Sequence, residues 1–561
     1  MARRPLLIAA GAAVALYGAA QVALSTAAVR ARLTERIHAA LAAHLGEVAI
    51  RDARVDALFR VSFGPVALPL RRGGEPAVEI ERVRVRPALL ALLRGRLEPG
   101  EVELRGARIA APVAIGPLDA DLSPARGAAG DRLSGTVRLA GGGRIALEAT
   151  RGEDAIALAL RGDGIGPQDL PPALRSPSFA ISAGALAFEV DARGAADLSS
   201  AEATVRATVR DVFLEGTRIG PEPAGPLATE ARGVVSWDAP TRRISVHDAT
   251  VTAPGDVPIS IGGEVRLEGD LPFSLAVRAA RVEYGALAGG LPPALALPPA
   301  APRPQGAFDA RLDLSGPLET PAAWTVDAAL DLAALRATAR RGPPSPLAAT
   351  FVHHPPTDPR RAIVVGPESP DFVPLEELPE HVVRAVTTSE DGGFFAHSGF
   401  DFDELRNALA EGTEAGHVVR GGSTITQQLA KNLFLSGDRT LARKVREAVI
   451  TIGLEASVSK RRLLEIYLNV AEWGPGVYGI GPAARHWFGK DARELTAKEA
   501  AFLASIIPSP IRYHAMYDRG FPTDRWEAHV NDLLFKMSAQ GALSDEQLEE
   551  GLDAPLFFRG G

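Results

Sequence analysis

The chain has 561 residues, too many for one hydrophobic core, so we expect two or three domains. It contains no cysteine, which excludes disulfides and thiolate metal sites. The formal net charge of −7 gives no support to general nucleic-acid binding, and no nucleic-acid partner is expected.

Residues 1–30 are predicted to form a transmembrane anchor. The stretch between Arg4 and Arg30 contains no charged residue, and as a helix it is long enough to cross a hydrocarbon layer of roughly 30 Å. A cleaved signal peptide is the alternative, because small residues around Ala20 and Ala23 suit a processing site. Arginines lie on both sides of the stretch, so the sequence alone does not decide its orientation.

Residues 31–340 are predicted to form a large antiparallel β-rich domain. The domain begins with an amphipathic helix, because apolar residues recur every four positions from Leu33 to Leu45, before Gly46. The spacing then changes to two, between Gly, Pro and Asp turns, which indicates antiparallel strands. The alternating positions are Val102 and Leu104, Val137 and Leu139, Ile145 and Leu147, Ile156 and Leu158, Val265 and Leu267, Phe273 to Val277, and Phe308 to Leu314.

A helical run, PALLALLRGRL (87–97), interrupts this pattern and is followed by EPGEVELRGARI (98–109). Together the two runs resemble the AsmA-like proteins, whose curved sheets can carry a lipid-facing groove. Three roles stay open for the β-rich domain: a spacer next to the membrane, guidance of a lipid, or binding of a partner protein. Its residues suggest no active site.

Two proline-rich stretches follow. LPPALALPPAAPRPQG (291–306) is predicted to be a loop within the β region, because strand patterns resume after it. Residues 341–361 are predicted to be a proline-rich linker, and residues 362–561 a separate C-terminal domain. His353 and His354 fall in this linker, where chance explains them better than metal binding.

The C-terminal domain is predicted to be mostly helical and contains five dense sequence blocks. They are EDGGFFAHSGFD (390–401), GGSTITQQLAKN (421–432), RKVREAVITIGLE (443–455), KRRLLEIYLN (460–469) and LTAKEAAFLASIIPSP (495–510). In the last block Thr496 and Glu499 form a capping box, and Pro508 ends the helix, which we expect to be core.

The first block places a carboxylate at a bend. Glu390 and Asp391 precede two glycines and an aromatic pair, so the bend lies beside apolar surface, where loss of hydration raises a carboxyl pKa. Asp391 is expected to cap the turn and orient Glu390. His397, between aromatics and a glycine, is expected to be structural rather than a metal ligand or proton shuttle.

The second and third blocks are predicted to be helices. Ser423 or Thr424 is expected to cap the second block, and Arg443 and Glu447, four residues apart, share one face of the third. The predicted apolar stripes are Ile425, Leu429 and Leu433 in the second block, and Val445, Ala448 and Ile452 in the third.

Two carboxylates, Glu390 and Glu447, thus accompany three cations, Lys431, Arg439 and Arg443. This assortment suits general-base catalysis beside an anionic leaving group. The five blocks resemble the motifs of the family 51 glycosyltransferases, the peptidoglycan transglycosylases that polymerise lipid II.

This resemblance covers residues 363–552 and implies a lysozyme-like, mostly α fold. Glu390 matches the general base that deprotonates the acceptor sugar 4-hydroxyl, and Glu447 matches the second catalytic glutamate of the family. Lys431 and Arg439 match the cations that hold the pyrophosphate. The candidate substrate-binding residues are Lys431, Arg439, Arg443, Lys444, Ser423, Thr424, Gln427, Gln428 and Asn432.

The resemblance implies inverting transfer that joins lipid II into β-1,4-linked glycan strands and releases undecaprenyl diphosphate. It also implies a divalent cation, Mg²⁺ or Mn²⁺, that Glu447 would help position, although the sequence has no metal motif of its own. Expected partners are lipid II, the growing glycan strand, the cytoplasmic membrane, and transpeptidases or other cell-wall synthesis proteins, because no transpeptidase domain follows Gly561. The expected location is the bacterial cytoplasmic membrane, single-pass, with the catalytic domain on the periplasmic side.

The expected fold class is therefore α+β multidomain: a transmembrane helix, a β-rich domain and a mostly α transglycosylase domain. Two other functions stay open. One is a lysozyme-like lytic transglycosylase, since a lone glutamate also serves as an acid in that class. The other is a non-enzymatic envelope scaffold that binds lipid. SVSK (457–460) mimics the nucleophile motif of penicillin-binding transpeptidases, but no SDN or KTG companion appears.

Overall fold

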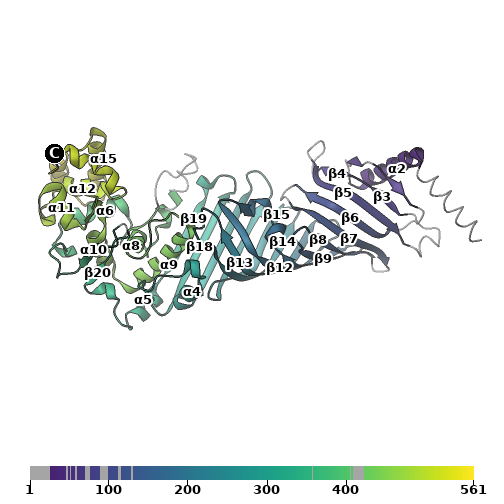
Figure 1. The fold of residues 1–561 in the computed structure, drawn as a ribbon, viewed down its shortest axis with the longest axis horizontal. Helices are drawn as coiled ribbons and strands as arrows, with labels where there is room; N and C mark the ends of the chain where they lie inside the picture. Colours follow the sequence, from purple (N-terminus) through teal and green to yellow (C-terminus); the bar gives the residue numbers. More distant parts are fainter. Residues whose placement is uncertain are drawn as a thin grey trace, which may run out of the picture. The chain divides into compact units, whose positions relative to one another are not determined.

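The computed structural model describes residues 26–45, 49–50, 52–56, 60–69, 76–88, 99–110, 115–127, 130–356, 358–404, 406–407 and 422–560 (Figure 1). The chain forms two compact units. The N-terminal unit runs to Thr252 and includes Ile261–Glu268, and the C-terminal unit comprises Ala253–Ser260 and Gly269–Gly561. A large antiparallel sheet and a helical C-terminal region are both present, as the sequence predicted.

The predicted anchor lies almost wholly outside the described residues, which begin at residue 26. No helix within the described ranges is both long and apolar enough to cross a bilayer. A helix is present where the sequence predicted the amphipathic one, as α2 (Ala27–Leu45). The helix predicted at 87–97 also falls mostly on residues outside the description.

The N-terminal unit is built from antiparallel strands, each paired with a neighbour close in sequence from β5 to β10 and from β12 to β15. The alternating positions at 102–104, 137–139, 145–147 and 156–158 lie in strands, β6, β8, β9 and β10, as predicted. The bounds are β1 (Ala49–Ile50), β2 (Arg54–Val55), β3 (Val61–Phe63), β4 (Val66–Pro69), β5 (Pro76–Pro87), β6 (Pro99–Ile109), β7 (Ile115–Gly127), β8 (Gly130–Leu139), β9 (Arg144–Arg151), β10 (Ala155–Ile165), β11 (Arg175–Ser176), β12 (Phe179–Ala195), β13 (Ser200–Glu215), β14 (Ala224–Asp238), β15 (Arg243–Ala253) and β16 (Val257–Arg266).

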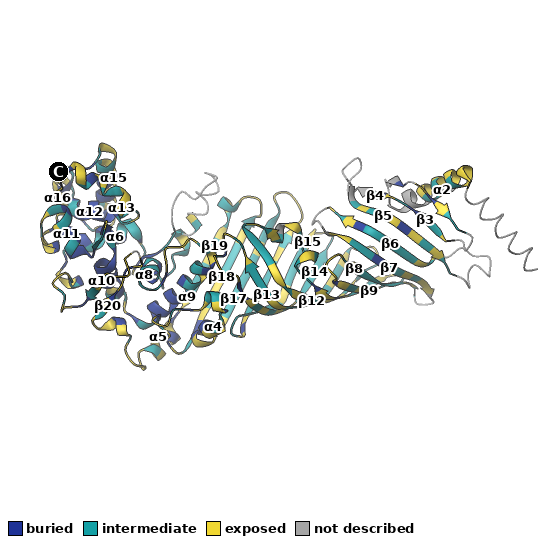
Figure 2. Ribbon diagram, viewed as in Figure 1, coloured by how far each residue is buried: buried dark blue, intermediate teal, exposed yellow. Residues whose placement is uncertain are grey.

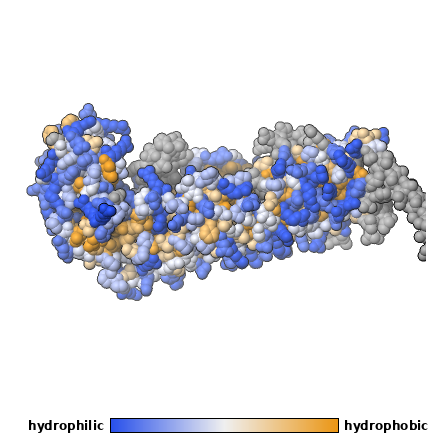
Figure 3. Space-filling view, viewed as in Figure 1, coloured by the Kyte–Doolittle hydropathy of each residue, from blue (hydrophilic) through white to orange (hydrophobic). Residues whose placement is uncertain are grey.

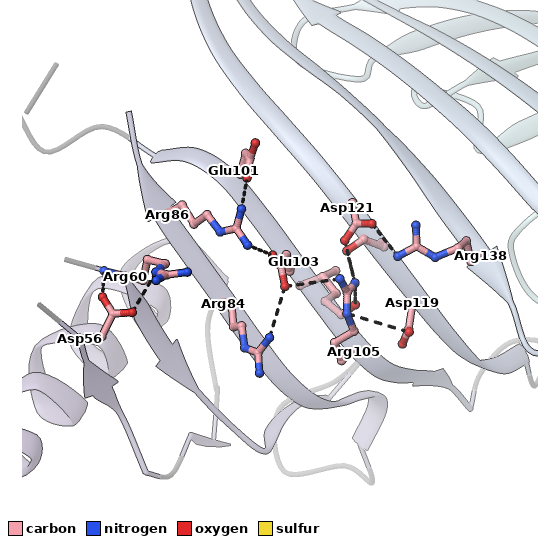
Figure 4. Close-up of polar contacts among 12 residues, drawn as sticks. Asp56, Arg60, Arg84, Arg86, Glu101, Glu103, Arg105, Asp119, Asp121 and Arg138 are labelled. Atoms are coloured by element: carbon pink, nitrogen blue, oxygen red, sulfur yellow. Dashed lines mark hydrogen bonds and ion pairs between the residues drawn. The ribbon is translucent and has the colours of Figure 1, made fainter. Parts of the chain in front are cut away.

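One face of strands β5 to β8 carries a series of cross-strand ion pairs (Figure 4). Glu103 lies 2.8 Å from Arg86 and 3.4 Å from Arg105, and Arg105 reaches Asp121 on the next strand at 2.7 Å. Because side chains alternate between the faces of a strand, the residues between these charges point to the opposite face. There Val83 joins a small buried cluster with Phe63, against which Ile37 of α2, among others, packs.

The C-terminal unit begins with three antiparallel strands and continues into helices. The bounds are β17 (Pro272–Glu283), α4 (Tyr284–Gly290), β18 (Ala307–Pro317), β19 (Thr325–Asp331), α5 (Ala333–Ala339), β20 (Phe351–His353), β21 (Ile363–Val365), α6 (Glu380–Glu390), α8 (Ile425–Phe434), α9 (Leu441–Ser457), α10 (Lys460–Val470), β22 (Glu472–Gly474), β23 (Val477–Tyr478), α11 (Ile480–Phe488), α12 (Ala497–Ile506), α13 (Pro510–Tyr513), α14 (Ala515–Arg519), α15 (Asp524–Ala539) and α16 (Asp545–Asp553). Its buried residues lie mainly in the helices (Figure 2), and the face seen in Figure 3 shows both hydrophilic and hydrophobic residues.

One hydrophobic core runs from the strand segment into the helices. Tyr284, Leu332 and Leu335 belong to the same buried cluster as the helices α6, α8, α9, α10 and α12. The proline-rich stretch 291–306 lies between α4 and β18, as predicted, but Leu297 and Ala301 within it are also buried in this core.

The predicted linker, 341–361, belongs to this unit rather than separating two units. Leu347 is buried, and β20 within the stretch pairs with β21. Arg462 of α10 donates to the carbonyl oxygens of Leu347 and Ala349, at 3.0 and 3.1 Å, which holds the stretch against the helices. Proline content therefore identified an irregular segment but not its packing. The limits of the functional domains stay a prediction.

The apolar stripe predicted for α9 is wrong at its first position, because Val445 is 41% exposed. The buried face instead includes Val449, Ile450 and Leu454, together with Ile452. In α8 the predicted stripe holds: Ile425 and Leu429 are fully buried and Leu433 packs against the core. The capping box at Thr496 is also confirmed.

Candidate active site

Glu390 is the last residue of α6, and its carboxylate is half-buried. Its Oε2 accepts a hydrogen bond of 2.8 Å from Nε2 of Gln428 in α8. The other end of that amide, Oε1, accepts from the hydroxyl of Tyr467 in α10 at 2.9 Å. Burial raises the pKa of Tyr467, so the phenol stays protonated and fixes the orientation of the amide. Residues of α8 and α10 therefore position one hydrogen-bond donor, Nε2 of Gln428, at the carboxylate of Glu390 at the end of α6.

The environment of Glu390 makes its carboxylate a stronger base. Burial raises its pKa, and the charge of Asp391 raises it further, while the Gln428 hydrogen bond and the charge of Lys431 lower it. The net direction is upward. Lys431 is itself affected: burial lowers its pKa, and the charges of Glu447 and Glu390 oppose that change. Lys431 thus interacts electrostatically with both candidate glutamates.

The start of α8 is held by its own cap and by the first block. Thr424 is the N-cap, and Thr424 and Gln427 form a capping box. The backbone N–H of Ile425 donates to Oδ2 of Asp391 at 2.9 Å, and Thr424 Oγ1 donates to Gly399 O at 2.7 Å. Thr424, predicted to contact substrate, is buried and used in this cap, and so is Gln427. Asp391 thus binds the first backbone N–H of α8 with one carboxylate oxygen, while its other oxygen contacts His397 within its own block.

Glu447 in α9 is buried, with 4% of its side chain exposed, and is paired with two cations of its own helix. Arg443 donates to Oε2 and Lys444 to Oε1. Lys444 Nζ also donates to Ser423 Oγ at 3.1 Å. Nε of Arg443 is buried and has no hydrogen-bond partner among the described residues. The hydrogen bond between Arg443 and Glu447 is the contact that their four-residue spacing predicted.

These cations line a cleft of about 450 Å³. Lys431, Arg443 and Lys444 contribute from the helices, and Arg439 contributes from the exposed loop between α8 and α9. Asn432, Ser423, Gln427, Gln428 and Glu447 line it as well. Glu390 is not in the lining, but Gln428 and Tyr467, which hold its carboxylate, are.

Among the described residues of the lining, four with titratable side chains were missed by the sequence analysis: His353, Tyr467, Glu472 and Tyr478. His353 is 5% exposed, and burial lowers its pKa to about 4, so it is neutral at pH 7. The available signal for Tyr467 was its place in a motif block. His353 had none, because its neighbourhood of prolines indicated only irregular chain.

His397 is structural in its contacts. Its Nε2 lies 2.8 Å from Oδ1 of Asp391, and its Nδ1 accepts from the N–H of Gly399 at 3.1 Å. Ligand atoms of Asp391, His397 and Asp401 lie within 4.8 Å of one another. Asp391 and Asp401 each accept a backbone N–H as well, at 2.9 Å. Protein hydrogen bonds thus already engage each of the three side chains.

Among the described residues, the cleft offers no set of free oxygen ligands that fits the divalent cation implied by the resemblance. Mg²⁺ and Mn²⁺ take oxygen ligands, but each oxygen of Glu447 already accepts from a cationic side chain. The other carboxylate of the lining, Glu472, accepts from the N–H of Gly476 at 3.2 Å. We therefore derive no step through a metal ion.

Residues 360–538 match the family model described as Transglycosylase. Over 142 residues the chain is 51% identical to the biosynthetic peptidoglycan transglycosylase of Nitrosospira multiformis, covering 25% of this chain and 62% of that protein. It is 50% identical over 167 residues to the protein of that name in Azoarcus sp., covering 30% and 70%. It is 40% identical over 192 residues to penicillin-binding protein 1A of Aquifex aeolicus, covering 34% and 26%.

The matched region contains all five blocks and every residue that lines the cleft from α8, α9 and α10. The chain covers less than two thirds of the Nitrosospira multiformis protein and somewhat more than two thirds of the Azoarcus sp. protein. With the motifs, the helical region and these identities in agreement, the chain belongs to the transglycosylase family.

Proposed function

We propose that this chain is a peptidoglycan glycosyltransferase that polymerises lipid II into β-1,4-linked glycan strands. The observation that supports this function best is a cleft whose described lining holds four cations and the paired carboxylate of Glu447, beside a second carboxylate, Glu390, that the Gln428 amide holds. The cations suit a diphosphate and the second carboxylate suits a general base.

Glu390 is the general base in this proposal. It takes the proton of the 4-hydroxyl of the acceptor lipid II, and that oxygen forms a bond with the anomeric carbon of the growing chain. The bond from this carbon to the lipid diphosphate breaks with inversion, and its electron pair leaves with the diphosphate. Burial, which raises the pKa of Glu390, strengthens it as a proton acceptor.

The cations of the cleft stabilise the departing diphosphate. Arg439 is exposed and approaches from the loop, whereas Lys431 and Arg443 are half-buried. The guanidinium of Arg443 lines the cleft, and guanidinium N–H groups form charge-assisted hydrogen bonds with phosphate oxygens. Glu447 acts as a positioning residue, because its two oxygens hold Arg443 and Lys444 in the cleft.

The substrate carries a lipid, so we place the reaction at the cytoplasmic membrane, with residues 1–30 as a single-pass anchor and the cleft on the periplasmic side. Proteolysis of intact and lysed spheroplasts tests this topology: a cleft on the periplasmic side is cut in both. Transpeptidases are the partners that crosslinking of the product requires.

Purified full-length chain with labelled lipid II in detergent tests the activity. Glu390→Gln is expected to lower polymerisation on the order of 10²–10⁴-fold, because it removes the base and keeps the shape of the side chain. The matched control is Glu380→Gln in the same helix, whose side chain is 82% exposed. Normal turnover by Glu390→Gln would refute the assignment. Release of fragments from sacculi, without polymer from lipid II, would instead support a lytic enzyme.

A further inference from the structure

A second buried glutamate, Glu455, joins four helices of the C-terminal unit. It lies near the end of α9, and only 1% of its side chain is exposed. Its Oε1 accepts from Thr426 Oγ1 of α8 at 2.6 Å and from Lys460 Nζ of α10 at 2.7 Å. Its Oε2 lies 3.4 Å from Nη2 of Arg336 in α5. A carboxylate buried this deeply requires cationic and hydrogen-bonding partners.

Arg336 comes from outside residues 360–538, the part of the chain that matches the family model. Its Nε donates to the backbone oxygen of Glu455 at 3.0 Å, and its Nη2 donates to Ser398 Oγ at 3.2 Å. The last carbonyl groups of a helix lack partners within the helix, and a cation there also complements the helix dipole. One guanidinium therefore holds the end of α9 and the block that begins with Glu390.

A second contact ties the same preceding segment to α9. Tyr284 is fully buried, and its hydroxyl lies 3.1 Å from Val449 O and 3.0 Å from Pro302 O. A Cβ at Gly453 would come within 2.6 Å of that hydroxyl oxygen, so the glycine allows the close approach. The segment before the matched region thus contacts α9 both at its middle and at its end.

We propose that Arg336 is a positioning residue for glycosyl transfer, which holds Glu455 and thereby fixes α8 against α9. This inference rests on the function proposed above. Thr426, which Glu455 anchors, directly precedes Gln427 and Gln428. Glu447 lies eight residues before Glu455 on α9, about 12 Å along a straight helix. The Glu455 contacts therefore set the distance between the group that holds Glu390 and the cations of α9.

The test measures lipid II polymerisation by the full chain and three variants, with rates normalised to the folded fraction. Arg336→Ala is expected to lower kcat about tenfold or more and to change KM for lipid II by less than about threefold. Arg336→Lys is expected to recover part of that loss, because one ammonium reaches the carboxylate but cannot also serve the backbone oxygen and Ser398. The matched control is Arg340→Ala, an exposed arginine just beyond α5, which is expected to keep the wild-type kcat.

The pH profile separates positioning from a loss of folded protein. The groups that act on Glu390 are Gln428 and Lys431 of α8, which lower its pKa, and Asp391, which raises it; Tyr467 of α10 faces the same amide. If α8 moves in Arg336→Ala, the two lowering interactions weaken, and the acid limb of kcat/KM shifts to higher pH. A smaller folded fraction alone leaves that limb in place.

A normalised kcat for Arg336→Ala equal to that of Arg340→Ala would overturn the inference, and so would a loss with an unshifted acid limb. If Arg336→Ala does not fold, Arg336→Lys carries the test, and a wild-type kcat and limb in that variant would overturn it. Inactive wild-type protein would refute the proposed function itself, and the inference would fall with it.

Discussion

One methyl group, added at Gly453 of α9, tests how the segment that contains Tyr284 and Pro302 packs on this helix. A Cβ there would lie 2.6 Å from the Tyr284 hydroxyl oxygen and 2.8 Å from the Pro302 carbonyl oxygen. Neither atom can move easily, because Tyr284 is fully buried and the Pro302 oxygen belongs to the backbone. Gly453→Ala is therefore expected to destabilise the C-terminal unit.

Two opposing effects set the magnitude. Replacing glycine by alanine inside a helix ordinarily raises the free energy of unfolding by about 1 kcal/mol. Overpacking a fixed core lowers it by about 1–3 kcal/mol, and two contacts under 3.0 Å place this site in the upper part of that range. We expect a net decrease in the free energy of unfolding of about 1–2 kcal/mol.

Denaturant unfolding followed by tryptophan fluorescence measures this change, because Trp473 and Trp487 are fully buried in the C-terminal unit. The matched control is Gly551→Ala in α16, where the new Cβ meets the two methyl groups of Leu534, at 3.2 and 3.7 Å. That variant is expected to be unchanged or up to about 1 kcal/mol more stable. Tyr284→Phe should recover part of the loss when combined with Gly453→Ala. A Gly453→Ala protein at least as stable as the wild type would refute the packing.

Two further predictions concern ionisation. Gln428→Leu removes a hydrogen bond that lowers the pKa of Glu390, so this pKa rises and the acid limb of kcat/KM for lipid II moves to higher pH; an unmoved limb would contradict the role of the amide. Burial, followed by the charge of His354, lowers the pKa of His353 to about 4. The unfolded chain binds this proton near its ordinary value of 6.5, so stability is fully present above pH 6.5 and falls as the pH drops toward 4, by up to about 3 kcal/mol. In denaturant unfolding at several pH values, His353→Phe should show a weaker fall than the wild type, and an equal fall would assign the effect to other groups.

The parts of the site that the sequence predicted are those that depend on neighbours in the chain. A capping residue acts within three positions of its partner, which made the Thr424 cap predictable. Arg443 and Glu447 are one helical turn apart, so their contact needed only the helix. The stripe of α9 failed at Val445 because this helix is buried all round from Val449 to Ala456, whereas its first turns are partly exposed, and one apolar period cannot describe both halves.

The remaining parts depend on partners far away in sequence. Arg336 and Glu455 are 119 residues apart, and Tyr284 and Val449 are 165 residues apart. Nothing in the local pattern around α5 distinguishes Arg336 from the exposed Arg340. His353 was equally hidden, because burial comes from the fold of the proline-rich stretch and not from its composition.

The net charge of the chain and the charge of its cleft have opposite signs. The whole chain carries −7, which gave no reason to expect a polyanion. Yet the cleft is lined by four cations, Lys431, Arg439, Arg443 and Lys444, against the carboxylates of Glu447 and Glu472. Charge develops on a departing diphosphate as its bond to the sugar breaks, so a fixed positive field stabilises the transition state more than the bound substrate. Arg443 and Lys444 are held in place by the buried Glu447, and the lining keeps more cations than carboxylates among the described residues. This arrangement suits the charged lipid diphosphate of the proposed reaction.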